Sequence, residues 1–220
     1  MQQQARRKMV ENQLRANKVT SDAILDVMGR LPRERFVPKR YAGLAYVDED
    51  LPLGQGRYAL EPMVLARLVQ ALEIDSKAIV LDVGCGLGYS TALLGALAGT
   101  VVAIEDDSAM IDQANGILND MGVDNAVVVK AGLSEGYPKQ APYDAILLNG
   151  AVPEVPEALA KQLSPEGRMA LVIKDDRGPA SGMGVATLVE RFGDSLASRA
   201  LFDAGTPLLP GFERETGFVF

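Results

Sequence analysis

The chain has 220 residues, 48% of them hydrophobic, with no histidine, one cysteine and a formal net charge of −7. Without histidine, Ser-His-Asp and Cys-His catalysis and His-based metal sites are excluded, and the single Cys85 excludes an internal disulfide and a four-cysteine zinc site. An acidic chain repels a phosphate backbone, so we expect no nucleic-acid partner. Since no apolar run could span a bilayer and residues 1–13 lack the apolar core of a signal peptide, we expect no membrane partner and a cytoplasmic location.

The N-terminal quarter predicts helices followed by a long loop. Apolar spacing indicates a helix over residues 3–17 and a second one that begins after Thr20 or Ser21 and ends before Pro32. Residues 41–58 are rich in acids and turn formers, and a loop of this length in a compact domain usually covers something. A further helix opens at Pro62.

A glycine-rich stretch is the main functional signal. The apolar run at residues 78–81 predicts a buried strand, and after it come Asp82, then Gly84, Gly86 and Gly88. Helical spacing resumes at Tyr89. A strand, a glycine turn and a helix in this order let the backbone approach a ligand closely.

An acidic residue follows the next predicted strand. Residues 100–104 are apolar and end at Glu105, which lies 21 positions after Gly84. An acid about 20 residues after the first glycine can accept hydrogen bonds from both hydroxyls of a ribose. The alternative is a turn that binds nothing, with Glu105 simply solvated. No Gly-Lys-Ser/Thr follows the glycines, so a phosphate-cradling P-loop is excluded.

Strands and helices alternate through the rest of the chain. We expect a helix over 108–120 capped by Ser108, strands over 125–129, 143–149 and 167–173, and a helix over 153–163. A flexible loop is expected at 178–184, followed by two or three more strands that include residues 217–220. This alternation predicts an α/β fold with a doubly wound, mostly parallel sheet and a helical N-terminal extension.

The glycine stretch with its two acids resembles the class I S-adenosylmethionine (SAM) methyltransferases. The resemblance implies SAM as cofactor, with Asp82 at its methionine end and Glu105 on its ribose. Cys85, between two glycines, is interpreted as a small filler residue rather than a reactive thiol. The cofactor-binding residues implied are Asp82, Gly84, Cys85, Gly86, Gly88, Glu105, Asp106, Ala131, Gly132 and Asn149. Residues 61–220 would form the SAM-binding domain, and residues 1–60 an extension with a substrate or lid loop.

Further stretches resemble the protein-L-isoaspartate O-methyltransferases over residues 8–174. They include Pro32-Arg33-Glu34-Arg35-Phe36-Val37-Pro38, Leu51-Pro52-Leu53-Gly54-Gln55-Gly56 and Ala141-Pro142-Tyr143-Asp144-Ala145-Ile146. The resemblance implies methyl transfer to the isoaspartyl carboxylate of a damaged protein or peptide. Because a carboxylate is already ionised at pH 7, this reaction needs no general base and suits a chain without histidine.

The chain departs from this family at two places. Where the family has Thr-Ile-Ser-x-Pro beside the reacting carboxylate, this chain has Tyr58-Ala59-Leu60-Glu61-Pro62. Leu60 lacks the hydroxyl, Glu61 adds a negative charge, and Tyr58 or backbone N–H groups are left to steady the carboxylate.

Gly132 stands where the family has the acid that contacts adenine. Either Glu135 or Ser134 replaces that acid, or packing and backbone groups alone hold the adenine. Two alternative functions therefore remain at this stage: a SAM methyltransferase with another, cationic acceptor, and a SAM-binding protein without catalysis.

Overall fold

A computed structural model describes residues 2–175 and 182–213 of the chain. Its centre is a seven-stranded sheet with the order β5-β4-β3-β6-β7-β8-β9. The strands are β3 (Ile79–Val83), β4 (Thr100–Glu105), β5 (Ala126–Lys130), β6 (Tyr143–Val152), β7 (Leu163–Ile173), β8 (Gly184–Phe192) and β9 (Ser195–Ala204). The first five strands in this order are parallel, whereas β8 and β9 run antiparallel to their neighbours. The α/β fold with a mostly parallel sheet is confirmed.

Alternate strand residues build two separate hydrophobic layers. On β3, Val80 belongs to the layer under the helices, while Leu81 and Val83 belong to the layer on the opposite face. The first face is covered by α3 (Pro62–Leu72), α4 (Tyr89–Gly95) and α5 (Ser108–Asp120). Both faces are covered, which is why the parallel strands are apolar throughout.

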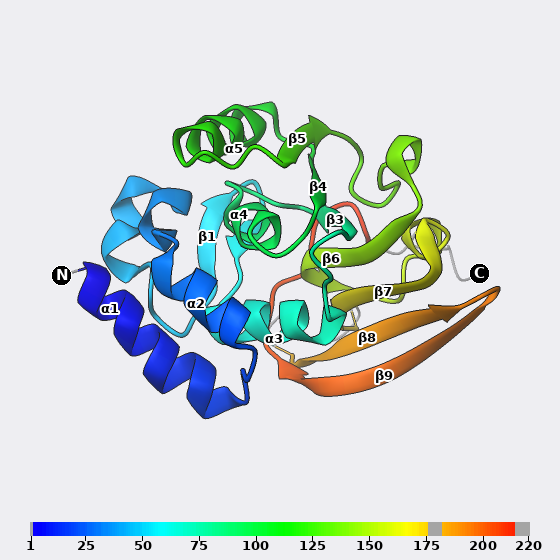
Figure 1. The fold of residues 1–220 in the computed structure, drawn as a ribbon, viewed down its shortest axis with the longest axis horizontal. Coiled ribbons are helices and arrows are strands. Elements are labelled where there is room, and N and C mark those ends of the chain that lie inside the picture. The colour runs from blue at the N-terminus through cyan, green and yellow to red at the C-terminus, as the bar shows by residue number, and fades with distance from the viewer. Residues whose placement is uncertain (1, 176–181, 214–220) are drawn as a thin grey trace, which may run out of the picture.

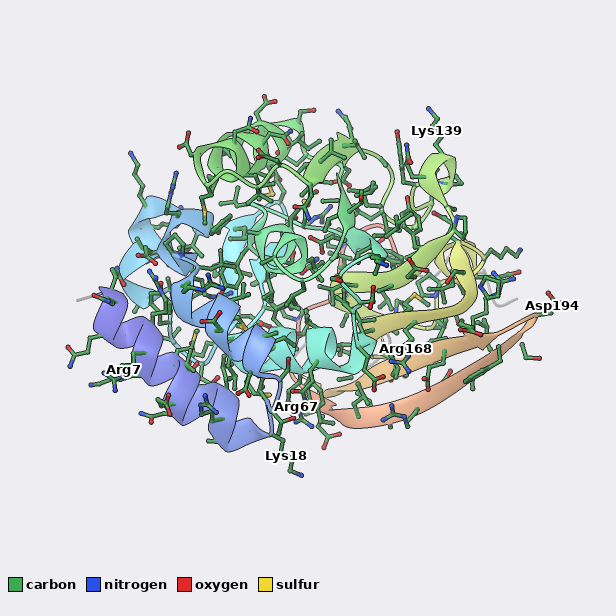
Figure 2. All side chains as sticks on the ribbon, in the orientation of Figure 1. Arg7, Lys18, Arg67, Lys139, Arg168 and Asp194 are labelled. Carbon is green, nitrogen blue, oxygen red and sulfur yellow. The ribbon has the colours of Figure 1, made fainter. Side chains whose placement is uncertain are left out.

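The N-terminal helices lie at the opposite side of the molecule from the tip of the β8–β9 hairpin, which Asp194 marks (Figures 1 and 2). The segment from residue 2 begins with α1 (Gln2–Met9), continues as a π-helix (Val10–Leu14) and closes with a 3₁₀ turn (Arg15–Asn17). Helix α2 (Asp22–Arg30) is capped by Ser21, whose hydroxyl accepts the Ile24 N–H. Among the described residues, no helix has both the length and the apolar composition that crossing a membrane requires.

The expected loop at residues 41–58 contains more regular structure than predicted. Two 3₁₀ helices (Arg33–Phe36 and Lys39–Leu44) lead into an antiparallel hairpin of β1 (Leu51–Gly54) and β2 (Arg57–Ala59). The turn between these strands holds Gly54, Gln55 and Gly56 at φ values of 114°, 49° and 71°. Positive φ at consecutive residues is how a tight hairpin reverses direction.

Two expectations for the second half need correction, and a third cannot be compared with the structure. The N-cap of α5 is Asp107, which accepts the Met110 N–H, whereas the Ser108 hydroxyl accepts from Lys130 Nζ. The expected helix over 153–163 is only α6 (Glu157–Ala160), because Pro153 and Pro156 lack N–H donors and the Leu163 end has joined β7. The expected loop at 178–184 falls largely, and the strand at 217–220 entirely, outside the described residues.

Candidate active site

The predicted ligand site lies where the chain order of the sheet reverses. Strand β3 has β4 on one side and β6 on the other, so the loops after β3 and β6 diverge at their carboxyl ends. Ligands of open α/β sheets bind in the crevice outside such a switch point. The turn from β3 into α4 fills this position, with Gly84 and Gly86 at φ values of 69° and 54°.

Asp82, at the end of β3, is fully buried and holds the two sides of the crevice together. Its Oδ2 accepts hydrogen bonds from Ser90 Oγ at 2.8 Å and Thr91 Oγ1 at 2.7 Å, both on α4. Its Oδ1 accepts from Asn149 Nδ2 of β6 at 2.6 Å. Burial raises the pKa of Asp82, and the three hydrogen bonds act in the opposite direction.

Glu105, at the end of β4, is also fully buried and faces the glycine turn. Its Oε2 accepts the Gly86 N–H at 3.1 Å, and its Oε1 accepts the Asp106 N–H at 2.9 Å. Burial raises the pKa of Glu105, and the charge of Arg57 opposes this rise. The structure therefore brings Asp82 and Glu105 to the two sides of one turn, as the spacing predicted.

Arg57, on β2 of the hairpin, occupies the remaining acceptor positions of Glu105. Its Nε donates to Oε1 at 3.1 Å and to Oε2 at 3.3 Å, while its Nη2 donates to Asp106 Oδ1 at 2.6 Å. A carboxylate offers about four lone-pair sites. With backbone N–H groups on both oxygens as well, Glu105 has no site left for a ribose while Arg57 stays in place.

Two leucines cover the glycine turn from outside. A Cβ at Gly86 would lie 2.5 Å from Leu53 Cδ1 of β1, and a Cβ at Gly84 would lie 3.0 Å from Leu209 Cδ1 of the C-terminal segment. The cavity that remains between hairpin and turn measures about 20 Å³, which holds about one water molecule. The crevice is therefore closed in this structure.

A larger hollow of about 570 Å³ lies at the other end of the sheet, near Ala78, Asp144 and Arg168. Ala78 precedes β3, Asp144 is the second residue of β6, and Arg168 pairs with Ala145 near the amino end of β6. Because ligands of this fold class bind at the carboxyl ends, we do not assign the site to it.

The positions expected beside the acceptor lie on the hairpin and just after it. Tyr58 and Leu60 line the small cavity together with Asn149 and Ser90. Glu61 precedes α3, and its backbone N–H donates to Asp50 Oδ1 at 2.6 Å. Burial, followed by the charges of Asp50, Asp48 and Glu49, raises the pKa of Glu61 to about 7.

The segment after β5 closes the far side of the crevice. Ala131 donates its N–H to the Glu105 carbonyl at 3.1 Å. A Cβ at Gly132 would lie 3.2 Å from Glu135 Cδ and 3.4 Å from Glu135 Oε2. The Glu135 carboxylate thus fills the space that an acidic side chain at position 132 would take. Cys85 is buried, and burial raises the pKa of its thiol well above the usual value, as expected for a filler residue.

Several residues of the site escaped sequence analysis. Arg57 and Leu53 come from the hairpin, Leu209 from the C-terminal segment, and Arg33 and Tyr89 from the borders of the cavity. A buried arginine carries no local sequence signal, because the pattern shows a charge but not its neighbours.

A family model described as protein-L-isoaspartate(D-aspartate) O-methyltransferase (PCMT) matches residues 4–184. A protein-L-isoaspartate O-methyltransferase of Methanoculleus marisnigri is 39% identical over 188 residues, which cover 86% of this chain and 84% of the relative. One of Methylorubrum populi is 37% identical over 209 residues, covering 94% of this chain and 96% of the relative.

Two solved structures share the fold. A protein-L-isoaspartate O-methyltransferase superposes with a TM-score of 0.78 at 23% identity, covering 96% of this chain and 67% of the other. A putative one from Plasmodium falciparum, in complex with S-adenosyl-L-homocysteine, gives a TM-score of 0.75 at 18% identity and covers 94% and 98% of the two chains. From the family match and the curated relatives together, the chain belongs to the protein-L-isoaspartate(D-aspartate) O-methyltransferase family of SAM-dependent enzymes.

Proposed function

We propose that this protein binds SAM at the glycine turn and methylates the isoaspartyl carboxylate of damaged proteins or peptides. The observation that carries the proposal is the pair of fully buried carboxylates, Asp82 and Glu105, on the two sides of the turn. Asp82 is fixed through Ser90, Thr91 and Asn149, and would face the cationic methionine end of the cofactor. Glu105 would accept the two ribose hydroxyls in place of Arg57.

The remaining cofactor contacts follow from the same geometry. The protein backbone would contact the cofactor closely at Gly84, Cys85, Gly86 and Gly88, and Asp106 would lie beside the ribose. At the adenine end, Ala131 and Gly132 would lie against the base. The carboxylate of Glu135, which lies against Gly132, would accept the adenine amino group. Of the three alternatives that the sequence left open, this contact favours Glu135.

When bound, SAM supplies a methyl group that its sulfonium has already activated. A carboxylate acceptor would gain a C–O bond as the C–S bond of SAM broke with its electron pair going to sulfur, so the residues of the site would not need to move a proton. The protein's part is to orient the two groups in line and exclude water. Tyr58, Leu60 and Asn149 surround the cavity where this would happen. A site of this kind needs no histidine.

The raised pKa of Glu61 bears on the charge of the acceptor. An ionised Glu61 would repel an incoming carboxylate, but with a pKa of about 7 this group is largely protonated at slightly acid pH. The raised pKa of Glu61 therefore reduces the repulsion that an anionic acceptor would meet.

The direct test uses SAM with a labelled methyl group and two peptides that differ only in an isoaspartyl or aspartyl linkage. The proposal predicts label on the isoaspartyl peptide alone, released again by mild base as expected for a methyl ester. No transfer at saturating SAM, with SAM binding shown separately, would refute the acceptor. Transfer to a cationic peptide instead would select the alternative function.

A further inference from the structure

Arg33 is a buried cation next to the cavity between hairpin and glycine turn. It is 1% exposed and begins the 3₁₀ helix Arg33–Phe36. Its Nε donates to the Ala45 carbonyl at 2.7 Å and its Nη2 to the Leu60 carbonyl at 2.6 Å. The third nitrogen, Nη1, has no hydrogen-bond partner among the described residues and is closed off from solvent.

The positive charge of Arg33 is attracted by Asp50 but has no ion-pair partner within the described residues. No carboxylate of the described chain forms an ion pair with it. Asp50 acts on it electrostatically, but its two oxygens accept from the Glu61 N–H and the Thr206 hydroxyl. Burial lowers the pKa of Arg33, although an arginine stays protonated in proteins. A buried charge without an ion-pair partner lowers the stability of the folded protein, and an anionic ligand that pairs with it would relieve this cost.

The Tyr89 hydroxyl is a second unsatisfied group at the same place. Tyr89 is buried, and its hydroxyl makes no well-formed hydrogen bond in the described part of the chain, although the charge of the neighbouring Arg33 opposes the rise that burial causes in its pKa. The Arg33 guanidinium lies 4.8 Å from the Tyr89 ring centroid, and the Phe36 ring packs against that ring edge-to-face at 5.5 Å. Arg33, Tyr89 and Leu60 all line the cavity that also includes Asn149, the residue bonded to Asp82.

We propose that Arg33 Nη1 and the Tyr89 hydroxyl bind one oxygen of the acceptor's carboxylate, leaving the other oxygen free to take the methyl group. This assignment rests on the proposed function and names the groups that recognise its substrate. Arg33 and Tyr89 would supply hydrogen-bond donors in place of the serine hydroxyl that Leu60 lacks, although both lie far from position 60 in the sequence. A guanidinium and a hydroxyl match a carboxylate, whereas a neutral carboxamide pairs with them more weakly.

The test measures peptide binding separately from turnover. In the presence of S-adenosyl-L-homocysteine, calorimetry compares the affinity for an isoaspartyl peptide with that for an otherwise identical peptide in which the α-carboxylate of the isoaspartyl residue is a carboxamide. The wild-type protein is expected to bind the carboxylate peptide at least about tenfold more tightly, the range for a hydrogen bond to a charged group. Tyr89→Phe removes only the ring hydroxyl and should reduce this preference severalfold, while Arg33→Met should abolish it.

Tyr143→Phe is the matched control, because the Tyr143 hydroxyl donates to the Tyr137 carbonyl at 2.7 Å on the other face of the sheet. We expect Tyr143→Phe to lower the stability of the protein and to keep its preference for the carboxylate peptide. We expect Tyr89→Phe to keep the stability and to reduce that preference. Equal binding of the two peptides by the wild type, or an unchanged preference in Tyr89→Phe, would overturn the assignment. Methyl transfer to the isoaspartyl peptide is measured separately and tests the proposed function. A failure of the Arg33–Tyr89 assignment can therefore be distinguished from a failure of the proposed function.

Discussion

Replacing Arg57 should make the cofactor bind more tightly. In the structure, Arg57 Nε bonds both oxygens of Glu105 and Arg57 Nη2 bonds Asp106. A ribose that uses Glu105 must first displace this arginine. A hydrogen bond to a charged group contributes about 1.5–3 kcal/mol net, and each 1.4 kcal/mol is a factor of ten in affinity. Arg57→Met is therefore expected to lower the Kd for SAM by about 10- to 100-fold.

The same variant should be less stable without cofactor. Removing Arg57 leaves the fully buried Glu105 without its counter-ion, and breaking a buried pair in this way costs about 3–5 kcal/mol. At roughly 2–4 °C per kcal/mol for a chain of this size, the apo melting temperature should fall by about 6–20 °C. Saturating SAM should recover most of that loss.

Calorimetric titration with SAM measures the affinity. The control is Arg168→Met, which removes an arginine that also pairs with two acids, Glu73 and Glu190, at the amino end of the sheet (Figure 2). Its Kd should not change. If Arg57→Met bound SAM with unchanged or weaker affinity, the ribose would not compete with Arg57 and our argument would be wrong.

Three further changes test other parts of the site. Asp82→Asn turns an acceptor of three hydrogen bonds into a group that carries a donor, so we expect SAM binding to weaken at least about tenfold and urea unfolding to show a loss of about 1–3 kcal/mol. Glu61 has a pKa raised to about 7, so it ionises as pH rises from 6 to 8; kcat/KM for the isoaspartyl peptide should fall over this range in the wild type and stay level in Glu61→Gln. Because its folded pKa lies above the ordinary 4.5, the wild type should also lose stability relative to Glu61→Gln as pH rises from about 4.5 to about 7, which melting curves would show. Glu135→Ala should raise the Kd for SAM by about 3- to 10-fold, and an unchanged value would leave adenine to packing alone.

The parts of the site that lie within one strand–turn–helix unit could be predicted from the sequence. Asp82 and the glycines sit on β3 and its turn, and Glu105 ends the next strand, so local patterns and one fixed spacing were enough to bring them together. The closed state could not be predicted in the same way. The pairing of Arg57 with Glu105 joins positions 48 residues apart and depends on how the hairpin packs on the sheet.

Local context also explains the remaining differences. The stretch around α6 has helical periodicity, yet Leu163 pairs with Tyr143 in the β6–β7 ladder, and the prolines before α6 shorten it from the other side. The cap of α5 moved by one residue, from Ser108 to Asp107, which is within the ordinary ambiguity between two adjacent capping residues. Unpartnered groups such as Arg33 Nη1 become visible only when every neighbour is placed.

The most direct test of the central claim is a crystal structure of the protein with S-adenosyl-L-homocysteine. We predict that both ribose hydroxyls donate to Glu105, that Arg57 has left this carboxylate, and that the methionine end lies beside Asp82. A structure in which Arg57 still holds Glu105, with the ligand bound elsewhere or making no contact with the glycine turn, would contradict the account.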